Sequence, residues 1–231
     1  MKLVALFGAV SLGAAACAPS SLANPARVSA AGPGLLPPHA AFDDLEHRLL
    51  SARSVRVKAR LHAEGLVTAS ISATLLLAGR RLRLDLDGDL EGQPVRGRLT
   101  SDGARLAGTG GKKPLATDTP PALAEGMLLG LTRMGLLHNA TQVLDGDPPA
   151  ATDGTARSWL SIGGFTAGPS DAIAFGLAVK GGVASDVTMA LDPATRLPRE
   201  RHMTVHFKGG DMRVTETYEA FAIDDVRDGE L

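Results

Sequence analysis

The stretch from Val55 to Ala63, which reads VRVKARLHA, alternates apolar and polar residues without interruption. Successive side chains of a β-strand point to opposite faces of a sheet, so this alternation predicts a strand with one buried and one solvated face. Strands of that kind are typical of antiparallel sheets, because parallel strands are usually covered on both faces. The stretch therefore favours an antiparallel sheet as the frame of the fold.

The same period of two returns along most of the chain, with glycine, Asp-Gly or Asp-Pro at the turns. Each segment has one apolar and one polar set of side chains, so the segments together predict a meander with one apolar face. The predicted strands after Ala63 are 69–77, 82–87, 95–100, 104–107, 173–179, 187–191, 203–207 and 212–218.

Two segments have a helical pattern instead. Residues His39 to Ala52 follow two prolines and place apolar residues on one face, and acidic residues near the start suit the helix dipole. Residues Pro121 to His138 are almost wholly apolar and include three glycines, so this helix needs packing to stabilise it. The apolar face of the first helix is predicted to hold Phe42, Leu45, Leu49 and Leu50. Helices between two sets of strands predict an α+β fold that is mainly β.

The N-terminal region is typical of an exported bacterial protein. Lys2 precedes an uncharged apolar run from Leu3 to Ala16, which is shorter than the roughly 20 residues of a membrane span. Cys17 follows Ala14, Ala15 and Ala16, and this resembles a lipobox, in which signal peptidase II cuts before a cysteine that receives diacylglycerol. Ala14 stands where the pattern prefers Leu. Cys17 is thus the predicted lipidation site.

These features divide the chain into a signal peptide (1–16), a flexible tether after the lipidated cysteine (17–38), a domain (39–225) and a disordered tail (226–231). The predicted location is the periplasm, anchored to a membrane. The outer membrane is favoured because Ala18, rather than Asp, follows the cysteine. Cleavage at Ser21-Leu22-Ala23 is the alternative, and it would leave a soluble periplasmic or secreted protein.

Composition and motifs exclude several function classes. The net charge of −1 and the few aromatic residues argue against nucleic-acid binding. One cysteine allows no intramolecular disulfide and no cysteine-based zinc site. His202 and His206 lie four apart on a predicted strand, about 13 Å from each other, which is too far for one metal ion. We therefore expect no enzyme activity, no metal and no cofactor, and a monomer.

Arg53, Arg56, Lys58 and Arg60 form a basic face on the first predicted strand. Such a face could meet anionic lipid headgroups, although a solvated strand face is the commoner arrangement.

Five short motifs, in order along the chain, resemble the LolA/LolB-like lipoprotein-carrier superfamily. They are Ser54-Val55-Arg56, Arg81-Leu82-Arg83-Leu84-Asp85, Ser101-Asp102-Gly103, the segment from Leu191 to Arg199, and Tyr218-Glu219-Ala220-Phe221. The resemblance implies a strongly curved antiparallel sheet, an incomplete β-barrel, with helices covering its concave face. It also implies a cavity for acyl chains, with a key arginine and aromatic residues that these motifs do not place.

The resemblance therefore predicts a membrane-anchored periplasmic lipoprotein that binds acyl chains of a lipid or lipoprotein, in lipid or lipoprotein transport or outer-membrane maintenance. The alternative is a structural or assembly lipoprotein that uses the same fold, with a filled core, as a protein-binding platform. The candidate cavity residues are Val57, Leu61, Ile71, Leu75, Leu82, Leu84, Leu99, Leu123, Met127, Leu131, Met134, Phe175, Leu177, Met189, Val205 and Phe207.

Overall fold

The computed structural model of this chain describes residues 36–111, 114–138, 160–179 and 182–231. The predicted signal peptide, Cys17 and all but the end of the predicted tether lie outside these residues, so they stay predictions. Among the described residues, no helix has both the length and the apolar character that a membrane crossing requires.

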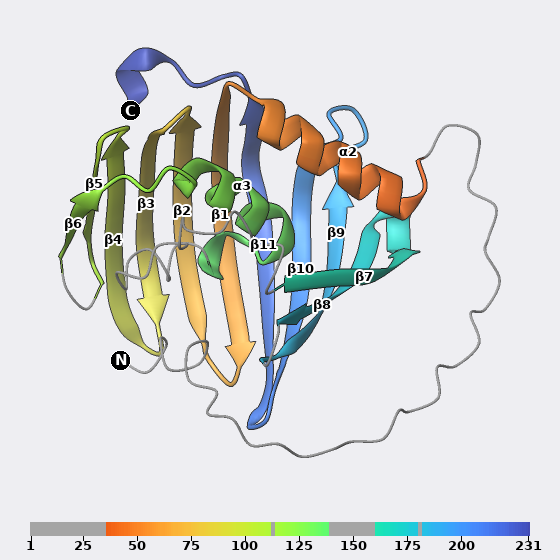
Figure 1. The fold of residues 1–231 in the computed structure, drawn as a ribbon. Helices are drawn as coiled ribbons and strands as arrows, with labels where there is room; N and C mark the ends of the chain where they lie inside the picture. The colour runs from red at the N-terminus through yellow and green to blue at the C-terminus, as the bar shows by residue number, and fades with distance from the viewer. Residues whose placement is uncertain (1–35, 112–113, 139–159, 180–181) are drawn as a thin grey trace.

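The described residues build one antiparallel sheet of 11 strands, in the order β6-β5-β4-β3-β2-β1-β11-β10-β9-β8-β7. The first strand pairs with the last, so the two halves of the chain join at β1 and β11 in the middle of the sheet (Figure 1). The first half holds β1 (Ser54–Gly65), β2 (Ala69–Ala78), β3 (Arg81–Leu90), β4 (Gln93–Asp102), β5 (Arg105–Thr109) and β6 (Leu115–Asp118). The second half holds β7 (Leu160–Ala167), β8 (Ile173–Val179), β9 (Ala184–Leu191), β10 (Pro198–Phe207) and β11 (Gly210–Ile223).

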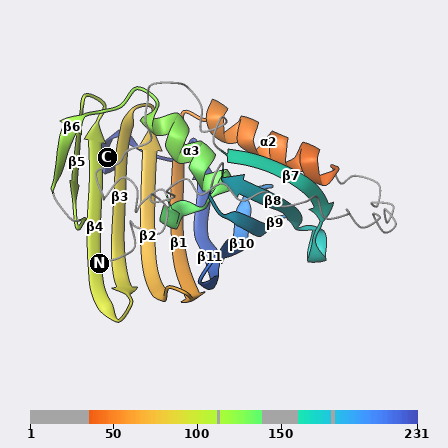
Figure 2. The same cartoon turned by 60° about the horizontal axis from the view of Figure 1, so that its bottom comes forward.

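The sheet curves strongly but does not close, because β6 and β7 are its two end strands and do not pair with each other (Figure 2). The helices α2 (Pro38–Ser51) and α3 (Leu123–Arg133) both lie over one side of it (Figures 1 and 2). This arrangement confirms the predicted mainly β fold, an incomplete barrel with helices over one face. Two short 3-10 helices, η1 (Pro169–Asp171) and η2 (Asp228–Glu230), complete the described elements.

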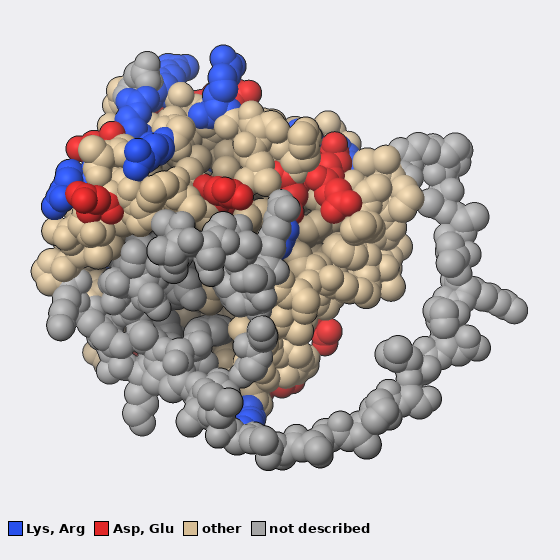
Figure 3. Space-filling model, in the orientation of Figure 1, with Lys and Arg blue, Asp and Glu red and all other residues tan. Residues whose placement is uncertain are grey.

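The helices cover the face of the sheet that carries the apolar side chains of the strands, and the core lies between them. In β1 the residues Val55, Val57 and Leu61 are buried, whereas Lys58 and Arg60 between them are exposed. The side chains of this apolar face join those of α2 and α3 in one hydrophobic cluster. On the helix-covered side, charged side chains gather around α2 and near the C-terminus (Figure 3).

The structure differs from the sequence prediction in both helices. The predicted helix 121–138 is interrupted at Gly135, whose φ of +88° lies in the left-handed region, and residues 136–138 are helical again. Leu50, predicted to lie on the apolar face of the first helix, is exposed, while Phe42, Leu45 and Leu49 are buried.

The structure also differs at the edges of the domain. The strands β6 and β7 were not predicted from the sequence. Residues 226–231, expected to form a disordered tail, include η2, and Glu230 accepts two hydrogen bonds from the guanidinium group of Arg56, at 2.9 and 2.7 Å. Because Arg56 also pairs with Asp225, the end of the chain is fixed on the first strand.

Candidate functional site

The candidate cavity residues come together on the helix-covered side of the sheet. All of them except the half-buried Phe207 are buried, and all contribute to the single hydrophobic cluster. Four of them, Leu123, Met127, Leu131 and Met134, belong to α3 and its C-terminal end, which therefore packs against the apolar face of the sheet. A trough on the charged face and a small pocket beside the start of α2 are not lined by residues of this set. These residues therefore form a buried apolar interior.

A buried arginine holds the C-terminal end of α3. Arg201 projects from β10 into the interior with 1% of its surface exposed. Its guanidinium group donates to the carbonyl oxygens of Leu131 at 3.4 Å and Thr132 at 2.9 Å, and also to that of Arg133. These are among the last carbonyls of the helix, which have no partner within it. The cation therefore both satisfies these carbonyls and complements the negative end of the helix dipole.

A buried glutamate holds the chain just beyond α3. Glu216 on β11 is the direct cross-strand neighbour of Arg201 and is also 1% exposed. Its Oε1 accepts hydrogen bonds from the backbone N–H groups of Leu136 at 2.9 Å and Leu137 at 3.3 Å. The Tyr218 hydroxyl donates to its other oxygen at 2.6 Å. Glu216 thus lies at the N-terminal end of the helical residues 136–138, where the dipole favours an anion.

Gly135 makes this arrangement possible. It lies between the helix end held by Arg201 and the one held by Glu216, and a Cβ atom at this position would come within 2.5 Å of Glu216 Oε1. The positive φ and the close approach of the carboxylate both require glycine. Two oppositely charged neighbours on the sheet therefore each bind one helix end, with the turn at Gly135 between them.

A second buried contact joins α3 to α2. Arg133 donates from Nε and from a terminal nitrogen to the two carboxylate oxygens of Glu46, at 2.5 and 2.7 Å. The Thr132 hydroxyl donates to the same carboxylate at 3.0 Å. Both charged residues are buried, and a bidentate geometry of this kind is the strong form of an arginine–carboxylate pair. The position of α3 is thus fixed by directional polar contacts as well as by packing.

His138 completes the polar part of the interior. Burial, together with the positive charge of Arg201, lowers the pKa of His138 to about 4. The imidazole is therefore neutral at pH 7. Burial also raises the pKa of Tyr218 well above its usual value, so its hydroxyl keeps the proton that it donates to Glu216.

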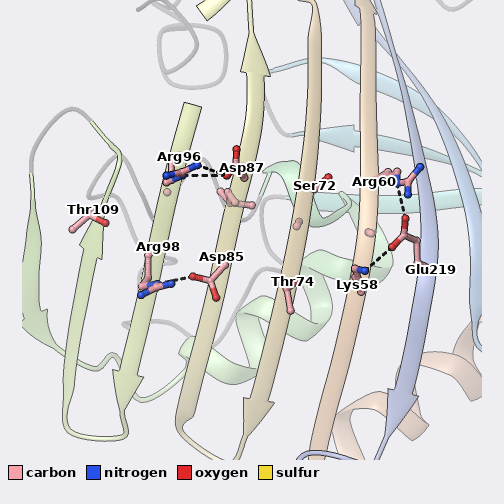
Figure 4. A pocket seen from close by; sticks show the side chains of 14 residues that line it. Lys58, Arg60, Ser72, Thr74, Asp85, Asp87, Arg96, Arg98, Thr109 and Glu219 are labelled. Atoms are coloured by element: carbon pink, nitrogen blue, oxygen red, sulfur yellow. Dashed lines mark hydrogen bonds and ion pairs between the residues drawn. The ribbon is translucent and has the colours of Figure 1, made fainter. Parts of the chain in front are cut away.

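The opposite face of the sheet carries the charges. A trough with a volume of about 550 Å³ lies over β2, between charged side chains from β1 and β11 on one side and from β3 and β4 on the other (Figure 4). Asp85 accepts from Arg98 at 2.5 Å, and Asp87 accepts from Arg96 at 2.8 Å. Burial opposes ionisation of Asp85, but hydrogen bonds from Arg98 and Arg83 outweigh it and lower its pKa.

The basic face predicted on the first strand is balanced by acidic residues. Lys58 and Arg60 both pair with Glu219, at 3.1 and 2.5 Å. Glu219 reaches this position because the pairing of β1 with β11 contains a bulge beside Lys58, and the bulge leaves Glu219 as the extra residue. Hydrogen bonding to Lys58, with a contribution from Arg60, lowers the pKa of Glu219. The face is therefore one of mixed charge.

The two histidines considered as metal ligands lie on β10, as the alternation predicted. His206 lies between Asp186 and Asp211, and these carboxylates raise its pKa by hydrogen bonding. His202 contacts Thr215 and Glu200. Among the described residues, no group of three or more His, Cys, Asp or Glu side chains is placed to hold a metal ion.

No protein-family model and no curated protein sequence matches the chain. Solved structures do match. The crystal structure of LprF from Mycobacterium bovis is 10% identical, with a TM-score of 0.34, over 79% of this chain and 93% of that chain. A LolA superfamily protein from Nitrosomonas europaea is 9% identical, with a TM-score of 0.34, over 84% of this chain and 97% of that one.

A third match is the MucA/MucB complex of Pseudomonas aeruginosa, 12% identical with a TM-score of 0.39. It covers 82% of this chain and 58% of the matched chain.

Sequence reasoning placed the apolar residues of the site but missed the charged residues among them. Arg201 is in phase with Met203 and Val205 along β10, and Glu216 is in phase with Met212 and Val214 along β11. A charged residue in the buried phase of a strand is a signal for a buried polar contact. Its partner, the end of α3, is distant in sequence and needed the three-dimensional structure.

Proposed function

We propose that this chain is a membrane-anchored periplasmic lipoprotein that binds acyl chains of a lipid or lipoprotein between its curved sheet and α3. The ligand would be held by burial of hydrocarbon, at roughly 25 cal/mol per Å² of apolar surface, with no catalysis. The proposed role is in lipid or lipoprotein transport or in outer-membrane maintenance.

The proposal is supported mainly by the way in which α3 covers the apolar face of the sheet. Its position depends on a few hydrogen bonds at its C-terminal end, from Arg201 and to Glu46, and not on packing alone. Three glycines in the segment from Pro121 to His138 weaken the intrinsic stability of the helix. Met127 and Met134 beneath it are flexible side chains that can repack around hydrocarbon. Displacement of α3 would open an apolar surface without disturbing the sheet.

The second candidate is a structural or assembly lipoprotein that presents the same domain as a protein-binding platform. The burial of the candidate cavity residues favours it, because every one of them but Phe207 is buried in the absence of a ligand. Lipid binding distinguishes the two candidates.

Purified chain should carry lipid in native mass spectrometry and should take up a fluorescent fatty acid. Met127→Trp, which fills space under α3, should weaken this uptake about tenfold, equal to roughly 1.4 kcal/mol. Leu50→Trp is the matched control, because Leu50 is exposed on α2, and it should leave uptake unchanged. A chain that is free of lipid and excludes the probe would contradict acyl-chain binding and leave the platform role.

The anchor is tested by Cys17→Ala and membrane fractionation. If Cys17 carries the lipid, the variant should move from the membrane fraction to the soluble fraction, since two or three acyl chains are needed for lasting attachment. Ser20→Ala in the same predicted tether should stay in the membrane fraction. Equal amounts of Cys17→Ala and unaltered chain in the soluble fraction would instead support cleavage near Ala23.

A further inference from the structure

The charges on the face opposite the helices follow a regular order across five neighbouring strands (Figure 4). The order from β11 to β4 is anion, cation, hydroxyl, anion, cation. Strand by strand, the residues are Glu219 on β11, Lys58 and Arg60 on β1, Ser72 and Thr74 on β2, Asp85 and Asp87 on β3, and Arg96 and Arg98 on β4.

The strand register aligns these residues into two rows. In one row Arg60 pairs with Ser72, Ser72 with Asp87, and Asp87 with Arg96. The other row is parallel to it, two residues further along each strand, and contains Lys58, Thr74, Asp85 and Arg98. In both rows the hydroxyl of β2 lies in the centre, with a cation on one side and an anion on the other.

The sign of the charge is reversed across β2, because Lys58 and Arg60 on β1 mirror Asp85 and Asp87 on β3, and Arg96 and Arg98 on β4 mirror the single Glu219 on β11. When two copies stack with these faces together around a two-fold axis parallel to β2, β1 of each copy lies over β3 of the other. The same operation places β4 over β11 and β2 over itself. Lys58 and Arg60 then face Asp85 and Asp87 at the same height along the strands, and the two arginines of β4 share the single Glu219. In the next row along the strands, outside this contact, Arg56 lies opposite Arg83.

We propose that this face is a self-association surface, on which two copies of the chain meet around a two-fold axis over β2. The central contact joins Arg60 of each copy to Asp87 of the other. Contacts of Lys58 with Asp85, and of the arginines on β4 with Glu219, flank it. This inference does not depend on acyl-chain binding, and it replaces the expected monomer with a reversible dimer.

The charged groups at the centre are accessible and have bonding capacity left. The side chains of Arg60 and Asp87 are 76% and 64% exposed. Arg96 donates twice to Oδ2 of Asp87, which leaves Oδ1 to accept from a second copy. Arg60 contacts Glu219 through Nε, which leaves its terminal nitrogens to donate. The internal pairs hold both groups in place for the contact across the axis.

The shape of the face fits the same contact. Ser72 and Thr74 are short, so the longer side chains on either side of β2 stand above them as two walls. The two-fold axis brings the walls of opposite charge together, and the trough between them can hold water. Because twisted sheets diverge with distance from the point where they touch, the two copies make contact only near the middle of the two rows, around β2. We therefore expect weak, salt-sensitive association.

The test is a charge swap followed by sedimentation of the purified full chain. The unaltered chain should self-associate at about 0.1 M salt and dissociate at roughly 1 M, where the Debye length falls to about 3 Å. Arg60→Glu and Asp87→Lys should each weaken self-association about tenfold or more, because each places like charges opposite each other twice in the dimer. Asp43→Lys on α2, with the same change of net charge as Asp87→Lys, should have no effect.

Mixing the two swapped variants should restore association, since both central contacts of the mixed dimer are again between opposite charges. Restoration also shows that both variants are folded. A chain that stays monomeric up to about 1 mM, the weak end of specific affinity, overturns the proposal. Self-association that does not change with the charge swaps or with salt also overturns the proposal, and so does a mixture of the two variants that stays monomeric. In either case the trough would bind a different molecule or none.

Discussion

Replacing Arg201 with Met should lower the free energy of unfolding by about 3–5 kcal/mol, the range for removing one member of a buried charged contact. The carbonyls of Leu131, Thr132 and Arg133 would lose their donor inside the interior. Burial lowers the pKa of Arg201, and the negative charge of Glu216 opposes this shift. In the variant, Glu216 would therefore be left buried without the cation beside it. Urea denaturation of the variant and of the unaltered chain measures the difference.

Arg199→Met is the matched control, because Arg199 lies on the same strand with its side chain exposed. It should change stability by no more than about 0.5 kcal/mol. Arg201→Lys should fall between the two, because one ammonium group keeps the charge but cannot match the planar fork that spans several carbonyls. If Arg201→Met is as stable as Arg199→Met, the stability of the chain does not depend on the contact of Arg201 with the end of α3.

The frame of the fold could be predicted because most strands have one buried and one solvated face. Alternation identified the strands β1 to β4 and β8 to β11, since a slip of one residue would turn their apolar side chains away from the core. The end strands lacked this signal. The strand β7 reads LSIGGFTA, with two adjacent glycines and a bulge, and β6 has only four residues. End strands need little alternation, because fewer neighbours cover them.

The apolar part of the site could be predicted for the same reason, but its polar part could not. The contact of Arg201 with the end of α3 joins residues about 70 apart in sequence. The trough depends on register, because Asp87 faces Ser72 only through the pairing of β2 with β3. Periodicity shows which face a side chain occupies and gives no information on which strand lies beside it. The helix break at Gly135 was missed because the carboxylate that contacts this turn, that of Glu216, lies on β11.

The contact between α2 and α3 yields the second large effect. Glu46→Met alone should destabilise the chain by about 3–5 kcal/mol, because Arg133 would be left buried without its carboxylate. Arg133→Met alone should cost about as much, for the reverse reason. The double variant should come within roughly 1 kcal/mol of the unaltered chain, because neither charge then remains buried and the methionines can fill the space. Thr132 keeps a partner in all three, the carbonyl of Leu129.

The half-buried pair of Asp44 and Arg48 on the same helix gives the comparison, since its charged atoms lie 4.0 Å apart and are more accessible to solvent than those of Glu46 and Arg133. Removing either member should change stability by about 0.2–1 kcal/mol, and the double variant should show little coupling. For Glu46 and Arg133, a double-mutant cycle of the free energies of unfolding should give a coupling energy of several kcal/mol. Costs that simply add in the double variant would mean that the two side chains act by packing alone. In that case the contact between α2 and α3 would not depend on the charges of Glu46 and Arg133.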